Sequence, residues 1–274
     1  MFQNEDDLER EDLEVLPTDN LLITAKTEDD LSQLEVHVYD ETEENLYVHH
    51  DLMLPAFPLC LEWLDFPPNN GSSENNNDGV AGPSKTHGSY IAVGTFDPEI
   101  EIWSLDTVDG LYPDALLGRP DVSNQHVPVP LGTGKKKKKL VKARTANPHH
   151  HVDAVLSLAW NTQHRSLLAS ASADETVKLW DLSRPSTEPA VRSFDLHQDK
   201  VQAVEWNKTD PTVLLTGSYD RTVRTWDTRA PGSGVGAFVG SDVEALKWDP
   251  FDSHAFYVSL DPARTLIFCV ELAR

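Results

Sequence analysis

An internal repeat limits the possible folds of this chain more than any other feature. Residues 151–182 align with residues 197–228 without a gap, and equivalent residues such as Trp180 and Trp226 lie 46 positions apart. A unit of this length holds four short antiparallel strands with their turns. A single sheet of this size cannot bury both of its faces, so such units stack on one another. The sequence therefore predicts an all-β fold of repeated four-stranded blades.

The strands of the two copies follow from the alternation of apolar and polar residues and from the turn signals between them. In the first copy we expect strands at residues 155–160, 167–172, 176–180 and 190–194. In the second copy we expect them at residues 201–206, 213–218, 222–226 and 235–239.

Weaker copies of the same pattern flank these two units. Upstream, we expect strands at residues 21–26, 34–39, 46–50, 58–66, 90–96 and 99–105. Downstream, we expect them at residues 243–248, 255–260 and 264–274. About five blades are therefore visible, two of them incomplete, whereas closed rings of about seven blades are common for such repeats. We expect residues 20–274 to form a partial β-propeller, either as a fragment or as an open ring.

The polar residues that recur in the two copies resemble those of the WD40 family. In that family a His, a Ser or Thr, an Asp and a Trp form a hydrogen-bonded chain within each blade. The resemblance implies this network for His151, Ser172, Asp174 and Trp180, and for His197, Ser218, Asp220 and Trp226. A carboxylate can accept from the histidine, the histidine from the hydroxyl, and the hydroxyl from the indole N–H.

A single active site does not need to recur at equivalent positions, so we interpret these His, Ser and Asp residues as structural. We therefore predict a non-catalytic binding scaffold with no catalytic residues, no cofactor and no bound metal. The spacing of His149, His150 and His151 matches no zinc module, and no cysteine lies near them in the sequence.

The charge of the chain favours basic protein partners. The formal net charge is −22, and residues 1–53 carry 17 acidic residues against two basic ones. Such a surface suits ribosomal proteins or histone tails. The N-terminus lacks the pattern of a signal peptide, and no apolar run is long enough to span a membrane, so we expect no membrane partner. The two cysteines, Cys60 and Cys269, are typical of a reducing compartment.

Three segments interrupt the strand pattern, and we expect all three to be disordered. Residues 1–19 form an acidic tail, residues 67–88 are rich in Pro, Gly, Asn and Ser, and residues 118–150 link two blades. The last segment contains five consecutive lysines: Lys135, Lys136, Lys137, Lys138 and Lys139. This run is typical of a nuclear or nucleolar targeting signal, of a direct contact with RNA phosphates, or of a plain solvated loop.

Several further segments resemble the periodic tryptophan protein 1 family when taken together and in order. They are residues 34–39 (LEVHVY), 47–51 (YVHHD), 90–94 (YIAVG), the lysine run, and 155–182. The resemblance covers roughly residues 10–260 and departs near Pro262. It implies a protein of the nucleus and nucleolus that supports ribosome biogenesis, through rRNA production or processing or large-subunit assembly, and that works on pre-ribosomal particles.

A second hypothesis is a substrate receptor of a cullin-RING ubiquitin ligase. The receptor motif ends in Trp-Asp-x-Arg, and Trp226, Asp227 and Arg229 match this ending and form the candidate ligase-adaptor contact. Thr225 stands where the motif has a bulky apolar residue, which weakens the match. An ordinary repeat that ends in arginine explains the same residues.

Overall fold

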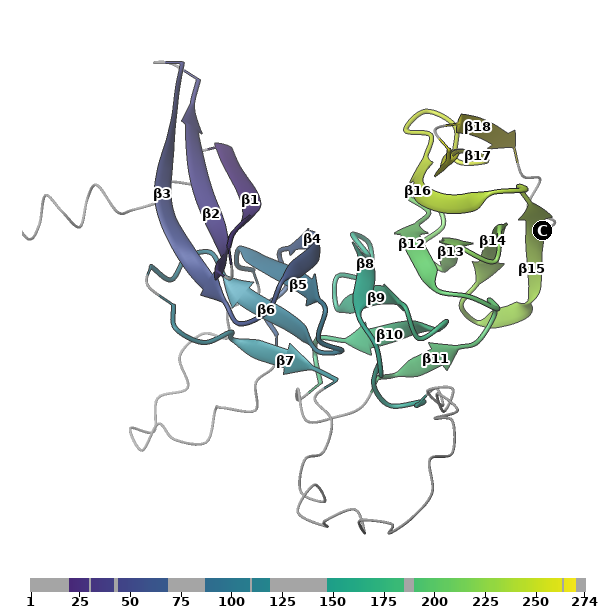
Figure 1. Cartoon of the computed structure of the whole chain (residues 1–274), viewed down its shortest axis with the longest axis horizontal. Coiled ribbons are helices and arrows are strands. Elements are labelled where there is room, and N and C mark those ends of the chain that lie inside the picture. The colour runs from purple at the N-terminus through teal and green to yellow at the C-terminus, as the bar shows by residue number, and fades with distance from the viewer. Residues whose placement is uncertain are drawn as a thin grey trace, which may run out of the picture.

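All regular secondary structure in the described residues is β-strand, and the strands form five antiparallel sheets (Figure 1). The computed structural model describes residues 20–29, 31–41, 44–68, 87–108, 110–118, 147–184, 190–262 and 264–269. The expected all-β fold of stacked antiparallel sheets is confirmed. Within the described part, none of the chain forms a helix that is long and apolar enough to cross a membrane.

The first two sheets contain the N-terminal strands. The first sheet has three strands in the order β1 (Asn20–Glu28), β2 (Leu31–Asp40) and β3 (Asn45–Leu54). The second sheet has four strands in the order β4 (Pro58–Leu64), β5 (Tyr90–Thr95), β6 (Ile100–Ser104) and β7 (Ala115–Leu117).

The other three sheets contain the two sequence copies and the C-terminal strands. The third sheet consists of β8 (Val155–Trp160), β9 (Leu167–Ser172), β10 (Val177–Asp181) and β11 (Arg192–Phe194). The fourth sheet consists of β12 (Val201–Trp206), β13 (Val213–Ser218), β14 (Thr222–Asp227) and β15 (Ala230–Phe238). The fifth sheet consists of β16 (Asp242–Trp248), β17 (Ala255–Asp261) and β18 (Arg264–Cys269).

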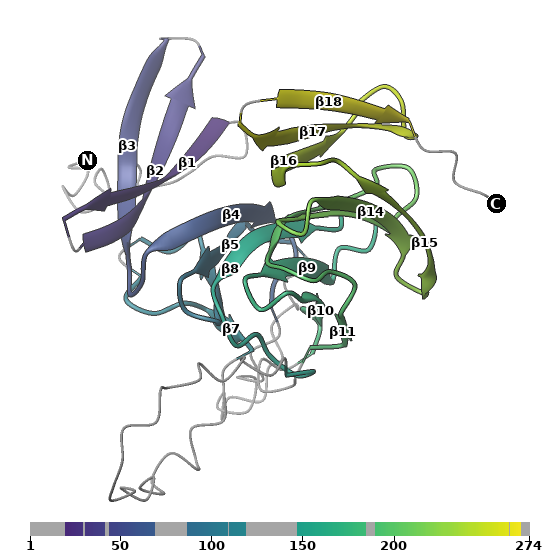
Figure 2. The same ribbon diagram turned by 45° about the vertical axis from the view of Figure 1, so that its right-hand side comes forward.

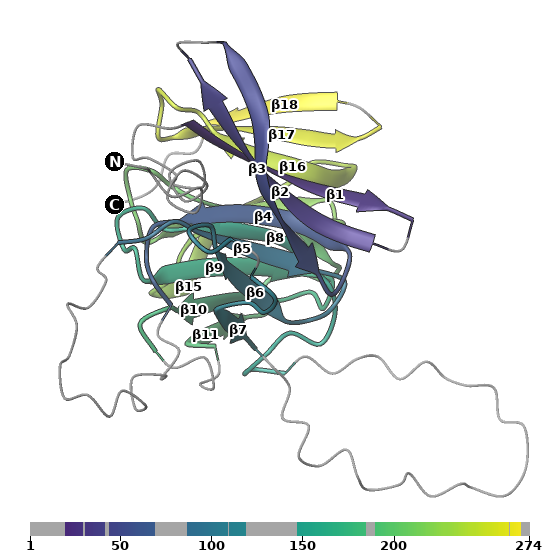
Figure 3. The ribbon, with the colours of Figure 1, turned by 90° about the vertical axis from the view of Figure 1, so that its left-hand side faces the viewer.

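The five sheets follow one another in an arc, with the first and fifth sheets at its two ends (Figures 1 and 2). The first strands of four successive sheets lie on the inner side of the arc, and each contacts the next in the order β4, β8, β12 and β16. The hairpin of β2 and β3 projects beyond the other sheets (Figure 3).

The core is divided into four apolar clusters, and each cluster joins two neighbouring sheets. In one of them, Leu64 and Ile100 of the second sheet pack with Leu168 and Trp180 of the third. Equivalent clusters lie between the first and second, the third and fourth, and the fourth and fifth sheets. The second, third and fourth sheets therefore pack against a neighbour on both faces, and the first and fifth sheets pack against one neighbour each.

The segments expected to be disordered lie mostly outside the described residues. Residues 1–19 lie wholly outside them, and so does the lysine run. Of residues 118–150, the structure describes Gly118 and residues 147–150, which pack against the third sheet. The Lys178 Nζ donates to the Asn147 carbonyl at 2.6 Å, and a Cβ on Gly118 would lie 2.7 Å from the Trp180 ring.

Candidate functional site

The third sheet contains a buried chain of hydrogen bonds that connects its loops and strands. His151 precedes β8, and its Nδ1 lies 2.9 Å from Oδ2 of Asp174 in the turn before β10. The His151 Nε2 lies 2.7 Å from Oγ of Ser170 on β9. The Trp180 Nε1–H on β10 donates to the same oxygen at 2.8 Å. The His151 and Ser170 side chains are fully buried, so water cannot replace these partners.

The protonation states in this chain follow from burial and from the hydrogen bonds. Burial lowers the pKa of His151, although Asp174 opposes this effect. Burial by itself raises the pKa of the Asp174 carboxyl, but hydrogen bonds from His151, Thr176 and the Val152 N–H outweigh it and hold the pKa below its ordinary value. A neutral ring that donates from Nδ1 must accept at Nε2, so the Ser170 O–H donates to His151. This hydroxyl is buried and engaged on both sides, and it cannot reach a substrate.

The fourth sheet repeats the same arrangement. The His197 Nδ1 lies 3.0 Å from Asp220 Oδ2, and its Nε2 lies 2.9 Å from Thr216 Oγ1. The Trp226 Nε1–H donates to Thr216 Oγ1 at 3.2 Å. Burial lowers the pKa of His197 as well. Because two sheets contain the same buried chain, its chemistry serves the blades and does not form a single active centre.

The hydroxyl at the centre of each chain differs from the one expected from the sequence. Ser170 and Thr216 hold this position, and the assignment of Ser172 and Ser218 is wrong. The hydroxyls of Ser172 and Ser218 bond instead to backbone groups of the adjoining turns.

The register of the strands explains this correction. Trp180 pairs directly with Leu168 across the ladder of β10 and β9. Its indole reaches Ser170 one diagonal step away, whereas Ser172 lies a further two residues toward the turn. Ser170 and Ser172 lie on the same side of a strand because side chains alternate with a period of two. The sequence pattern alone could not separate them.

The second sheet holds its tryptophan in a different way. The Trp103 Nε1–H on β6 donates to Glu101 Oε2 at 2.9 Å, and both side chains are buried. Burial raises the pKa of the Glu101 carboxyl, although the indole bond opposes this effect. One carboxylate on the same strand therefore takes the place of the hydroxyl acceptor that the third and fourth sheets use.

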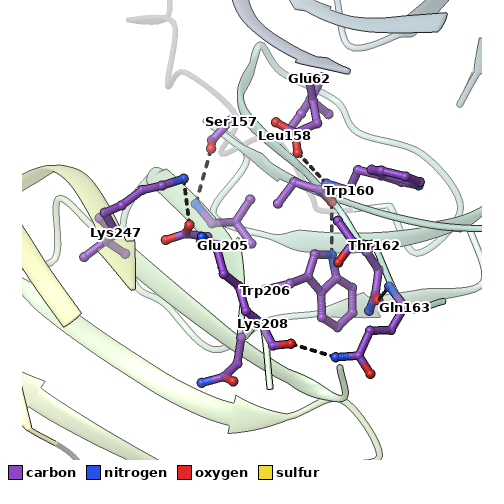
Figure 4. Close-up of a pocket in the computed structure, with 15 residues that line it drawn as sticks. Glu62, Ser157, Leu158, Trp160, Thr162, Gln163, Glu205, Trp206, Lys208 and Lys247 are labelled. Carbon is purple, nitrogen blue, oxygen red and sulfur yellow. Dashed lines mark hydrogen bonds and ion pairs between the residues drawn. The ribbon is translucent and has the colours of Figure 1, made fainter. Parts of the chain in front are cut away.

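A polar pocket of about 240 Å³ lies where the inner strands of the second to fifth sheets meet (Figure 4). The Glu62 Oε1 on β4 accepts the Trp160 backbone N–H at 2.9 Å. The Glu205 Oε2 on β12 accepts the Trp248 backbone N–H at 2.7 Å. In Figure 4, Lys247 points toward Glu205, and its Nζ lies 2.7 Å from the second carboxylate oxygen.

The carboxylates of this pocket connect inner strands that belong to different sheets. Burial raises the pKa of Glu62, and the Trp160 backbone N–H partly offsets this effect. Glu62 and Glu205 were not predicted as functional residues, although each directly precedes a strand tryptophan, at an equivalent position of its unit. Because both carboxylates accept backbone hydrogen bonds of the next sheet, we interpret the pocket as a joint between blades.

The three residues of the ligase hypothesis differ in accessibility. Trp226 is buried and cannot contact a partner. The Asp227 and Arg229 side chains are 25% and 72% exposed, and an ion pair of 2.6 Å joins them. Arg229 also lines a second pocket, of about 470 Å³, together with Phe66 and Arg165.

Comparison with known proteins identifies the repeats. A family model described as WD domain, G-beta repeat, matches residues 143–181 and 189–227, which contain the two buried hydrogen-bond chains. A chain in the crystal structure of the mitotic checkpoint complex superposes with a TM-score of 0.53 at 16% identity, covering 90% of this chain and 62% of that one. At this identity the likeness supports the fold alone.

Three curated relatives extend the match beyond the repeats. An uncharacterized WD repeat-containing protein of Schizosaccharomyces pombe is 53% identical over 94% of this chain. Periodic tryptophan protein 1 of Saccharomyces cerevisiae is 45% identical over 66% of it, and the Drosophila melanogaster homolog is 36% identical over 69%. The chain spans 45%, 33% and 34% of the lengths of these relatives. It is therefore a WD40-repeat protein and a homologue of periodic tryptophan protein 1.

Proposed function

We propose that this protein is a non-catalytic scaffold of the nucleus and nucleolus that supports ribosome biogenesis by binding basic proteins of pre-ribosomal particles. The process is rRNA production or processing, or assembly of the large subunit. The observation that carries the proposal is the division of polar groups between interior and surface. The repeated His, Ser or Thr, and Asp side chains are engaged inside two blades, whereas the chain as a whole carries a net charge of −22.

The relationship to periodic tryptophan protein 1 supports the choice of process. A WD40 fold supports protein binding, because its blades present loops and strand ends on rigid sheets. The acidic surface supports basic partners, since complementary charge speeds encounter and excludes acidic competitors. Histone tails are the second class of basic partner that this charge would suit.

Affinity purification of the tagged chain from nuclear extracts tests this proposal. We expect ribosomal proteins and precursor rRNA among the captured molecules, and a salt-sensitive yield because charge drives the contacts. A Trp180→Ala variant serves as a control for folding, since the loss of core packing should lower the yield of captured partners. Capture of neither ribosomal proteins nor precursor rRNA by the folded chain would contradict the proposal.

The lysine run supports nuclear targeting and direct contact with RNA. Replacement of Lys135 to Lys139 by glutamine should leave the circular dichroism spectrum unchanged and should reduce nuclear accumulation. If the run also contacts RNA, the same variant should retain less RNA during purification at fixed salt. Unchanged accumulation in nucleoli would argue against the targeting role.

The second candidate function is that of a substrate receptor of a cullin-RING ligase. The observation that favours it is the exposure of Arg229 beside a pocket at the end of the fourth sheet. An Arg229→Ala variant should then lose a ligase adaptor from the captured set while it keeps ribosomal partners. Because Thr225 departs from the receptor motif, we place this function second.

A further inference from the structure

Four successive sheets place one pair of residues each at the same end of their two innermost strands. The first member of each pair lies six residues before a tryptophan of the first strand. Each pair lies at or just beyond the last rung of the ladder to the second strand. Backbone hydrogen bonds of 3.2, 2.9 and 3.1 Å join three of the pairs, and the register of β16 and β17 joins the fourth. The pairs, here called the rim, are Phe57 with Phe96, Ala154 with Ala173, Lys200 with Tyr219, and Asp242 with Asp261.

The second sheet gives the rim an exposed aromatic pair. The side chains of Phe57 and Phe96 are 47% and 60% exposed, and their ring centroids lie 5.6 Å apart. Rings of this size are normally buried, because each exposed apolar area costs free energy in water. The next pair along the rim is Ala154 and Ala173, which have the smallest side chains of the four pairs.

The fourth and fifth sheets give the rim an acidic end. The Lys200 Nζ lies 3.6 Å from the centre of the Tyr219 ring, so this ring already holds one ammonium group on its face. The Tyr219 hydroxyl donates to Glu244 at 2.6 Å. This bond, together with burial and the nearby Glu244, Asp242 and Asp261 charges, raises the pKa of Tyr219 to about 12. The Asp242 carboxylate is already paired with Arg221 at 3.4 Å, so Glu244 and Asp261, both exposed, are the carboxylates at this end that a basic partner can approach.

We propose that the rim binds a basic protein segment that carries a large apolar side chain. The apolar side chain packs on Phe57 and Phe96, and lysine or arginine side chains of the segment lie toward Glu244 and Asp261. The inference rests on the proposed binding of basic partners. It adds that the rim is the binding surface and that the partner needs an apolar side chain as well as basic ones. Charge alone would recruit any basic chain, whereas the aromatic pair also requires an apolar residue in the same segment.

The test is a titration of the full chain with two fluorescent peptides. One peptide has a single leucine among lysines and serines, and the other has serine in place of the leucine. We expect the leucine peptide to bind the wild-type chain about tenfold more tightly. Phe96→Ala should weaken this peptide about tenfold and leave the serine peptide unchanged. Asp261→Asn should weaken both peptides about threefold, because it removes one partly solvated charge contact.

Two variants away from the rim control for general effects. Phe251→Ala removes a 97% exposed aromatic ring at the opposite end of the strands, and Asp51→Asn removes an exposed acidic charge on β3. Neither should change the binding of the leucine peptide. Melting temperatures within the error of the wild-type value will show that all four variants fold.

The outcomes separate this inference from the proposed function. Suppose that the wild-type chain captures ribosomal proteins but the rim variants bind the leucine peptide as tightly as the wild type does. The proposed binding role of the rim is then wrong, and the scaffold function stands. Equal binding of the two peptides by the wild-type chain would also overturn the role of the aromatic pair. If the wild-type chain captures no basic partner and binds neither peptide, both proposals fail.

Discussion

Substitution of Ser170 by alanine is the sharpest test of the buried chain in the third sheet. The Ser170 hydroxyl bonds to both His151 Nε2 and Trp180 Nε1, at 2.7 and 2.8 Å. Alanine leaves both nitrogens buried without this partner, and each such group costs about 1–3 kcal/mol. Some relaxation is expected, so the free energy of unfolding should fall by about 2–4 kcal/mol.

Urea unfolding followed by circular dichroism measures this loss. With a slope of about 2 kcal/mol per molar urea, the midpoint should fall by about 1–2 M. Ser170→Thr is the matched control, because Thr216 fills the same position in the fourth sheet and bonds in the same way. This variant should lose less than about 1 kcal/mol.

Ser172→Ala distinguishes the observed network from the one expected from the sequence. The Ser172 hydroxyl bonds to the Asp153 carbonyl and the Asp174 N–H at the partly exposed turn. Its loss should cost about 1 kcal/mol, less than the loss at Ser170. A larger effect for Ser172→Ala than for Ser170→Ala would refute the reasoning, and so would an unchanged midpoint for Ser170→Ala.

Three other predictions concern the same blades. Trp180→Ala and Trp226→Ala should each lower the free energy of unfolding by about 3–5 kcal/mol, through a core cavity and a lost donor, and unchanged melting temperatures would contradict the packing. Gly118→Ala should cost about 1–3 kcal/mol, because the residue has a φ of +75° and its Cβ would lie 2.7 Å from the Trp180 ring; a melting curve like that of the wild type would rule this out. His151 and His197 have pKa values below 6.5 in the folded chain, so the unfolded chain binds more protons and stability should fall as the pH drops below 6.5. The slope should reach at most about 1.4 kcal/mol per pH unit for each histidine, and urea midpoints that do not change between pH 7.5 and 5.5 would show that the rings are not held neutral.

The sequence predicted the strands best where an apolar run ends at clear turn residues. The bounds of β8, β9, β12 and β13 match the expected ranges to the residue. The three-residue strand β7 was missed, because so short a segment has no measurable period. Strand β15 begins at Ala230, five residues before the expected start. It follows a tight turn and pairs with β14 across a bulge, and neither leaves a periodic signal.

The candidate site was less predictable than the fold because its positions follow from packing between strands. Two serine hydroxyls lie on one side of β9, and the sequence does not show which of them accepts the indole N–H of Trp180. The register of the strands shows that it is Ser170. Glu62 and Glu205 contact the next sheet, so their role depends on how sheets stack and not on their own strands. Periodicity predicts which face of its own strand a residue occupies. It does not predict which residue of another strand or sheet that side chain contacts.

The repeat also explains why the residues that differ between blades lie at the ends of the strands. Positions that must bury the same groups in each blade keep the same residue types, as the His, Asp and Trp of the third and fourth sheets do. The rim positions are fixed in space by the same backbone pairing, yet only Ala154 is buried among them and the other side chains are partly or fully exposed. They accordingly change from paired phenylalanines to paired alanines, then to lysine with tyrosine, and finally to paired aspartates along the arc. A regular scaffold that varies its rim residues in this way can present an apolar contact at one end of the rim and an acidic contact at the other. A partner that matches only one of them gains only part of the binding free energy.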